Sequence, residues 1–179
     1  MLHYFKVLSM KRTGWFLLLF SALSLEAVAL YFQYGMELAP CVMCIYERVA
    51  LFGIVFAGIL GFIAPRMWLF RTLGLLTGLG SAVKGMTLAI KHVDYQMNPA
   101  PWNQCTYLPE FPSSFPLDKW FPALFHPSGS CSEITWQFLT LSMAQWIVII
   151  FAFYTLLLLL VLISQFKSVP LDSKRRIFR

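Results

Sequence analysis

The chain has 179 residues, of which 59% are hydrophobic and 12% charged, and its formal net charge is +6. The apolar fraction exceeds what a soluble core of this length needs, so the composition excludes an ordinary soluble domain and indicates a membrane protein. The basic residues cluster outside the apolar runs. This distribution fits membrane topology and argues against a nucleic acid partner.

The first apolar segment covers residues 15–32 and follows a basic N-terminus that contains no acidic residue. Its length predicts a membrane-spanning helix. A cleaved signal peptide is the alternative, because Ala27–Ala29 has the small-x-small form of a cleavage site. Glu26 fits poorly just before such a site and the apolar run continues through Phe32, so a first span is favoured.

The second predicted span, residues 45–64, follows a Cys-x-x-Cys pair formed by Cys41 and Cys44. Pro40 is suited to open a helix, so we expect the pair in its first turn, where the helix dipole favours a thiolate. Two thiols at this spacing close a small ring that opens by exchange, which indicates redox chemistry. Arg48 follows Cys44 by one turn, which predicts a cation about 5–6 Å from a potential thiolate.

Two further spans are predicted over residues 72–90 and 145–163. Lys84 interrupts the first of them near its predicted outer end, where a long side chain can snorkel to the interface. The other contains no charged residue. The fold class is therefore an all-α membrane protein with a four-transmembrane-helix bundle.

The charges predict the orientation of the bundle. The two tails and the turn 65–71 hold ten of the fourteen Lys and Arg residues but only one acid, Asp172. We therefore expect these segments in the cytoplasm and the loops 33–44 and 91–144 on the outer side. All four cysteines then face an oxidising compartment, and residues 1–179 form a single integral membrane domain.

The long outer loop contains seven of the ten prolines, and we expect it to be too proline-rich for regular structure. Ser113 and Ser114 suggest a solvated tip. A short interfacial helix is predicted further on, because apolar residues recur there at near-helical spacing. These residues are Leu117, Trp120, Phe121, Leu124 and Phe125. An irregular aromatic-rich loop resting on the lipid headgroups is the alternative.

Four cysteines permit three disulfide connectivities, and the sequence does not choose among them. The natural pairing is Cys41 with Cys44 and Cys105 with Cys131. A purely structural Cys105–Cys131 bond is one alternative, although a bond in an accessible loop is easily reached by an incoming thiolate. Zinc is another alternative, because the Cys-x-x-Cys pair with Cys105, Cys131, His92 or His126 supplies enough ligands. Structural zinc usually takes paired short spacings and the chain has one, which argues against a metal site.

Ionisable residues within or beside apolar spans are costly and often functional. Glu26, Glu47 and Arg48 are such residues. Pairing is a sufficient role for Glu26, whereas the register of Arg48 to Cys44 gives the arginine a definite task. His92, just past the third predicted span, is an interfacial histidine or one that handles protons or orients a ligand.

Several segments together resemble the DsbB family of bacterial inner-membrane disulfide-forming quinone reductases. They are Gly14-Trp15, Pro40-Cys41-Val42-Met43-Cys44-Ile45-Tyr46-Glu47-Arg48, Leu117-Asp118-Lys119-Trp120, Gln145-Trp146 and Ile163-Ser164-Gln165. The resemblance covers nearly the whole chain. One departure is Ala144, where the family pattern leads us to expect proline.

The resemblance implies that Cys41 and Cys44 exchange electrons with bound ubiquinone or menaquinone. It also implies that Cys105 and Cys131 exchange with DsbA, a periplasmic thioredoxin-fold thiol oxidase. Arg48 matches the family's quinone-site arginine. His92 and Met143 fall where that pocket forms, and we group Glu47 with them as a candidate cofactor-binding residue. A non-catalytic assembly factor and a related four-helix thiol–quinone enzyme with another partner are the rival classes.

Overall fold

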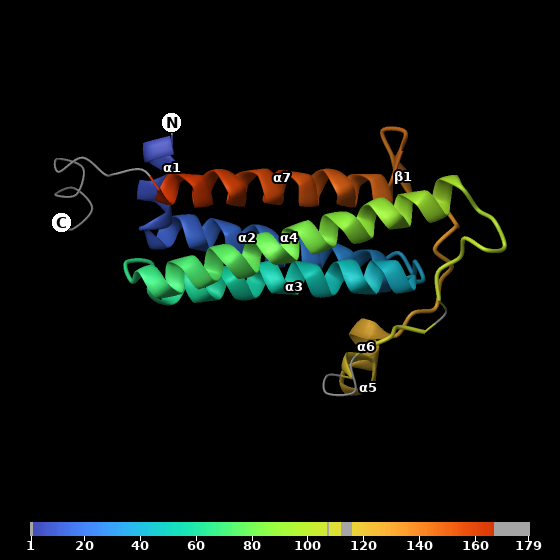
Figure 1. Ribbon diagram of the computed structural model, residues 1–179. Coiled ribbons are helices and arrows are strands. Elements are labelled where there is room, and N and C mark those ends of the chain that lie inside the picture. The colour runs from blue at the N-terminus through green and yellow to red at the C-terminus, as the bar shows by residue number, and fades with distance from the viewer. Residues whose placement is uncertain (1, 107, 112–115, 167–179) are drawn as a thin grey trace.

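The computed structural model describes residues 2–106, 108–111 and 116–166. Four long helices lie side by side as a bundle (Figure 1). They are α2 (Arg12–Tyr34), α3 (Val42–Ile63), α4 (Trp68–Met97) and α7 (Met143–Gln165). Each is long and apolar enough to cross a membrane, which confirms the predicted four-helix membrane fold.

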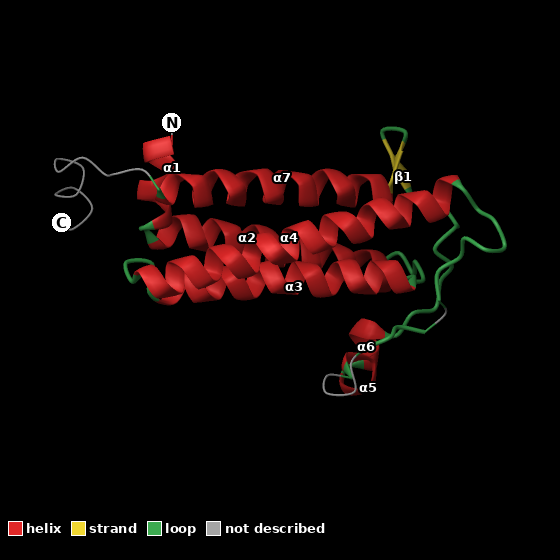
Figure 2. Cartoon of the chain, in the orientation of Figure 1, coloured by secondary structure: helices red, strands yellow, loops and turns green. Residues whose placement is uncertain are grey.

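Shorter elements lie at the two ends of the bundle (Figure 2). At one end, α1 (Leu2–Ser9) packs beside the end of α7, where Lys6 Nζ donates a 2.9 Å hydrogen bond to the Gln165 carbonyl. The opposite end, which we call the cysteine end, carries the remaining short elements. These are α5 (Leu117–Trp120), α6 (Pro122–Phe125), β1 (Gln137–Phe138) and β2 (Leu141–Ser142).

Small residues allow the helices to approach closely. This is usual in membranes, where the hydrophobic effect does not drive helices together and close packing takes its place. The Trp15 ring is buried between α3 and α4, and a side chain on Gly61 would overlap it. A Cβ on Gly74 would stand 3.1 Å from the same ring. The indole of Trp15 also donates a 2.8 Å hydrogen bond to the Ser9 carbonyl, so α1, α2, α3 and α4 meet at this residue.

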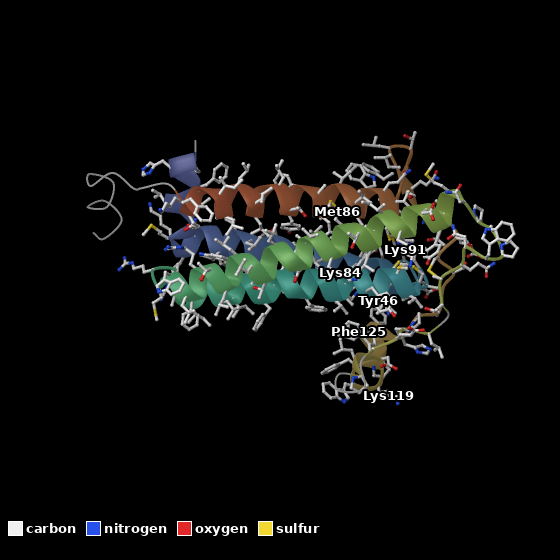
Figure 3. All side chains as sticks on the ribbon, viewed as in Figure 1. Tyr46, Lys84, Met86, Lys91, Lys119 and Phe125 are labelled. Carbon is white, nitrogen blue, oxygen red and sulfur yellow. A yellow bond between two sulfur atoms is a disulfide. The ribbon has the colours of Figure 1, made fainter. Side chains whose placement is uncertain are left out.

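The helix α4 is longer than the predicted span of residues 72–90. Its 30 residues correspond to roughly 45 Å at 1.5 Å per residue, more than the hydrocarbon core of a bilayer. Lys84, near one end of the predicted span, lies in the middle of α4 with an exposed side chain (Figure 3). His92 likewise lies inside the helix and not beyond it.

The predicted interfacial helix is in fact two single turns, α5 and α6. They separate at Phe121, whose backbone (φ −133°, ψ 66°) is not helical, and the following Pro122 has no N–H with which to continue a helix. Trp120 and Phe121 are exposed, whereas Phe125 is buried. Ser113 and Ser114 lie outside the described residues.

The expectation that the long loop lacks regular structure is also wrong, because β1 and β2 form an antiparallel hairpin. Phe138 pairs with Leu141, and the two residues between them, Leu139 and Thr140, have φ of 50° and 69°. Two left-handed residues are what a tight two-residue hairpin turn requires. The hairpin leads directly into α7.

Candidate functional site: two cysteine pairs beside an apolar cavity

The Cys-x-x-Cys pair opens helix α3, in the position predicted from Pro40. Cys41 is the N-cap residue, and its sulfur accepts a 3.3 Å hydrogen bond from the backbone N–H of Cys44. Both are free cysteines, and their sulfur atoms are 2.9 Å apart. The backbone N–H of Cys44 therefore points at the Cys41 sulfur, in the capping position of the helix N-terminus.

His92 of α4 lies against Cys41. Its Nε2 is 3.5 Å from the Cys41 sulfur, and its Nδ1 is 3.0 Å from Oε1 of Glu47 on α3. The side chains of His92 and Glu47 are each 4% exposed. Glu47, His92 and Cys41 thus form a buried chain of contacts that links two helices.

Sequence reasoning missed this chain of contacts. It placed His92 just past the third predicted span, whereas α4 continues through His92 to Met97 and buries the imidazole in the bundle. The available signal was the presence of two ionisable residues, Glu47 and His92, near the outer ends of neighbouring apolar segments.

Arg48 is buried one turn after Cys44. Its hydrogen bonds go to residues of other segments and not to the Cys44 thiol. Its Nη1 donates to Gln33 Oε1 at 2.9 Å and to the Leu124 carbonyl at 2.6 Å. Its Nε lies 3.6 Å from Oε2 of Glu26. The guanidinium therefore connects α2 and α3 with α6, and Glu26 has the pairing role that the sequence suggested.

An apolar cavity of about 320 Å³ opens between α2, α3 and α7 beside these residues. Four of the five candidate cofactor-binding residues, Cys44, Glu47, Arg48 and Met143, line this cavity, whereas His92 does not. The imidazole lies behind Cys41 and not in the wall. The remaining lining is mostly apolar and includes Leu25, Phe32, Leu51, Trp136, Trp146, Ile147, Ile150 and Phe151.

The start of α7, which contributes to the cavity wall, is well defined although Ala144 replaces the expected proline. The Ser142 hydroxyl accepts from the Gln145 N–H at 3.4 Å, and the Gln145 side chain accepts from the Ser142 N–H at 2.9 Å. This reciprocal capping box fixes the first turn without proline. Ala144 is completely buried within it.

The second cysteine pair is a disulfide between Cys105 and Cys131. Cys131 is buried in one cluster with Cys41, Met43 and Tyr95, and Cys44 and Cys105 pack against this cluster. The two cysteine pairs are therefore neighbours at the cysteine end of the bundle.

Backbone contacts hold the loop pair against the helix pair. The N–H groups of Ser128 and Gly129 donate to the Pro40 carbonyl at 2.9 and 3.1 Å. A side chain on Gly129 would overlap the Ala39 carbonyl, so the two segments can approach this closely because residue 129 is glycine. The loop that carries Cys131 is thus attached directly in front of Cys41.

Aromatic contacts hold α6 on the flank of α3. Phe125 lies 6.2 Å from the ring of Phe52 and 6.3 Å from that of Phe111, between centroids. Tyr46 packs against Phe111, and its hydroxyl accepts a 2.7 Å hydrogen bond from the N–H of Glu110. Figure 3 shows Tyr46 and Phe125 in this contact region.

Two adjacent cysteine pairs at one end of four apolar helices, with a cavity beside one of them, define a membrane thiol–disulfide oxidoreductase. The profile of the family described as "Disulfide bond formation protein DsbB" matches residues 11–161, and the chain belongs to this family. The family and the four spans make it a multi-pass inner-membrane protein of disulfide bond formation.

Three relatives are similar over almost their whole length, and each bears the name "Disulfide bond formation protein B". That of Mannheimia succiniciproducens is 67% identical over 100% of both chains. That of Pasteurella multocida is 62% identical over 99% of both chains. That of Haemophilus influenzae is 48% identical, again over 99% of both chains.

Proposed function

We propose that this protein reoxidises a periplasmic thioredoxin-fold thiol oxidase of the DsbA type and passes the electrons to a membrane quinone, ubiquinone or menaquinone. One observation carries the proposal. All four cysteines pack in one cluster, and among the described residues Cys44 is the cysteine that lines the apolar cavity. A thiol partner and an apolar oxidant would therefore meet the protein at different sulfurs.

The proposed orientation has both termini in the cytoplasm and all four cysteines in the periplasm, within one membrane domain of residues 1–179. The charge distribution of the sequence supports it. The fold is compatible with it, because α1 and the end of α7 lie at the end of the bundle opposite the cysteines (Figure 1). The active cysteines are then on the side where the partner is found.

In the first step, a thiolate of the reduced partner attacks Cys105 and forms a mixed disulfide, and Cys131 leaves as a thiolate. Cys105 is half-buried whereas Cys131 is 2% exposed, which favours attack at Cys105. Cys131 then attacks Cys41 of an oxidised Cys41–Cys44 pair and expels Cys44 as a thiolate. A leaving thiolate at this helix N-terminus is stabilised by the dipole.

In the second step, the partner's other thiol attacks the mixed disulfide and leaves with its own disulfide formed, which releases the Cys105 thiolate. Cys105 attacks Cys131, restores the Cys105–Cys131 bond and expels Cys41. The net result is one disulfide made in the partner and one reduced Cys41–Cys44 pair, which holds the two electrons.

His92 is in position to handle the proton of Cys41, since its Nε2 is 3.5 Å from that sulfur. Glu47 accepts from or donates to the opposite ring nitrogen and so fixes the orientation of the imidazole. In this role Glu47 and His92 are positioning and proton-holding residues for the helix pair.

The cavity fits a quinone head group. Its lining is mostly apolar, and its polar side chains are those of Gln33, Arg48, Glu26, Glu47 and Thr135. Arg48 Nε is buried and makes no hydrogen bond among the described residues, so the guanidinium retains a donor for a carbonyl oxygen. A bound quinone supplies the two-electron acceptor. Arg48 would orient it, Cys44 would face it, and Leu51, Ile147 and Phe151 would exclude water.

The proposal is tested with purified protein, a reduced thioredoxin-fold partner and a soluble quinone, by following quinone absorbance over time. We expect catalytic loss of the oxidised quinone that depends on both the protein and the partner. A non-catalytic assembly factor would show no turnover. A protein dedicated to another partner would reduce the quinone with a small dithiol but not with the DsbA-type protein.

A further inference from the structure

We propose that the reduced Cys41–Cys44 pair, together with His92, binds a zinc ion. Among the described residues, the two sulfurs and a ring nitrogen of this histidine all lie within 4.8 Å of one another. Cys41 and His92 are each 3% exposed. Two thiolates and an imidazole form a donor set that zinc prefers over the hard cations, and three protein ligands leave a fourth position open.

The separations suit this ion after a small adjustment. With Zn–S of about 2.3 Å and Zn–N of about 2.0–2.1 Å, ligand atoms on a tetrahedral zinc are roughly 3.5–3.8 Å apart. The distance from His92 Nε2 to the Cys41 sulfur is already 3.5 Å. The two sulfurs, now 2.9 Å apart, must separate by about 0.9 Å, which a rotation of the half-buried Cys44 side chain supplies.

Glu47 provides the hydrogen-bond partner that zinc-bound imidazoles usually have at the ring nitrogen that does not bind the metal. Its Oε1 lies 3.0 Å from Nδ1, which leaves Nε2 directed at the Cys41 sulfur. Carboxylate–histidine–zinc arrangements of this kind fix the ring and strengthen its binding to the metal. The hydrogen bond is present before any ion enters, so the site is preorganised.

An entry path and the local charges also favour a dication. Cys44 and Glu47 line the cavity, so the open fourth position faces a space from which an ion and a water molecule can arrive. Both thiols release their protons when the ion binds, and the ion with two thiolates is neutral. The nearby ion pair of Arg48 with Glu26 is then undisturbed.

The site exists in one redox state alone, because a Cys41–Cys44 disulfide has no thiolate to offer. This distinguishes it from the structural zinc site that the cysteine spacing argues against. The ion would not hold the fold together, but it would occupy the reduced pair and prevent its reoxidation. Binding itself is independent of the proposed function, whereas inhibition of turnover rests on it.

Cobalt titration tests the site directly, because tetrahedral Co²⁺ with thiolate ligands absorbs in the visible range. The protein used is the full-length Cys105→Ser/Cys131→Ser variant in detergent, reduced and freed of reductant without oxygen. We expect one equivalent of Co²⁺ to bind and Zn²⁺ to displace it. No binding, or equal binding to the form with an intact Cys41–Cys44 disulfide, would overturn the proposal.

Substitutions in the same background assign the ligands. Cys41→Ser should abolish the thiolate–cobalt absorption, and His92→Gln should weaken binding at least tenfold and change the visible bands. Glu47→Gln should weaken binding about 10- to 100-fold, the usual effect of losing an outer partner. His126→Gln, a change at an exposed histidine outside the cluster, is the matched control and should have no effect.

X-ray absorption of the zinc-loaded background protein gives an answer that does not depend on the folding of these ligand variants. Two sulfur ligands and one imidazole nitrogen are expected. A shell of oxygen and nitrogen alone, or His92→Gln protein with unchanged affinity and spectrum, would show that the cluster is not a zinc site.

Discussion

The two cysteine pairs lie next to each other in surroundings that differ in almost every respect. Cys41 and Cys44 are in the first turn of a 22-residue helix, beside buried charged side chains and a cavity. Cys105 and Cys131 lie in a segment made of short turns and isolated contacts. The same functional group is therefore presented once on a rigid helix and once in a loop.

The difference indicates a division of work. A pair that exchanges with another protein needs one accessible sulfur, which Cys105 offers. In the proposed function the Cys41–Cys44 pair passes electrons to an apolar molecule, which requires a fixed position; α3 and the contacts of His92 with Cys41 and Glu47 hold it there. The contact of Ser128 and Gly129 with the Pro40 carbonyl keeps the two environments within reach of each other.

The largest effect is expected from Cys44→Ser, which removes the sulfur that faces the cavity. Quinone reduction should be abolished, because serine can neither form the disulfide nor donate electrons. Attack of the partner on Cys105 should persist and give a mixed disulfide that is visible on a non-reducing gel. Quinone reduction at the normal rate by this variant would disprove the division of work between the pairs.

Arg48→Ala should have the next largest effect and should act on the cavity side alone. Loss of a buried, preorganised donor should lower kcat/KM for quinone on the order of 100-fold. The single-turnover reaction of the partner with Cys105–Cys131 should stay nearly normal. Arg48→Lys should fall in between, since lysine keeps the charge but loses the planar fork.

Arg48→Ala also leaves the Glu26 carboxylate buried without its partner, which is destabilising in itself. The Glu26→Gln/Arg48→Ala double variant removes that penalty and serves as the control. If the double variant recovers normal quinone kinetics, Arg48 has a structural role and does not orient the quinone.

Phe125→Ala should loosen the attachment of the loop to α3. Truncation of a buried phenylalanine costs on the order of 3 kcal/mol, so hydrogen exchange over α5 and α6 should become much faster. Phe121→Ala, four residues earlier, changes a side chain that is 55% exposed and is the matched control. Equal exchange rates in the two variants would contradict the packing described for Phe125.

The smallest effect is expected from Phe121→Asp, assayed in lipid vesicles and again in detergent. An exposed aromatic residue beside the bilayer contributes a modest anchoring free energy. Activity should fall a few-fold in vesicles and remain unchanged in detergent. The same loss in both media would show that Phe121 is not a membrane contact.

The sequence was sufficient for the features that depend on local patterns. Apolar run lengths gave the four spans, and Pro40 followed by two cysteines gave the start of α3. It was insufficient where the outcome depends on contacts between distant segments. The length of α4 is one case, since the polar residues after Ile90 remain helical with His92 and Tyr95 buried on one face.

The partners of Arg48 are the second case. Helical register placed the guanidinium near Cys44. Register gives distances along one helix, but it does not show which acceptors on other helices compete for the guanidinium. Gln33 of α2 and the Leu124 carbonyl of α6 accept hydrogen bonds from Nη1, and the Glu26 carboxylate lies 3.6 Å from Nε. The hydrogen bond between Glu47 and His92 could not be predicted from the sequence for the same reason, because it joins two different helices.

The most direct test of the division of work compares two reductants on the Cys105→Ser/Cys131→Ser variant, which keeps Cys41 and Cys44 alone. With a small dithiol as reductant, we expect the variant to reduce quinone. With the reduced thioredoxin-fold partner, turnover should be lost, because the sulfur that the partner attacks is gone. Turnover with the partner at the normal rate would show that the loop pair is dispensable and would contradict the account.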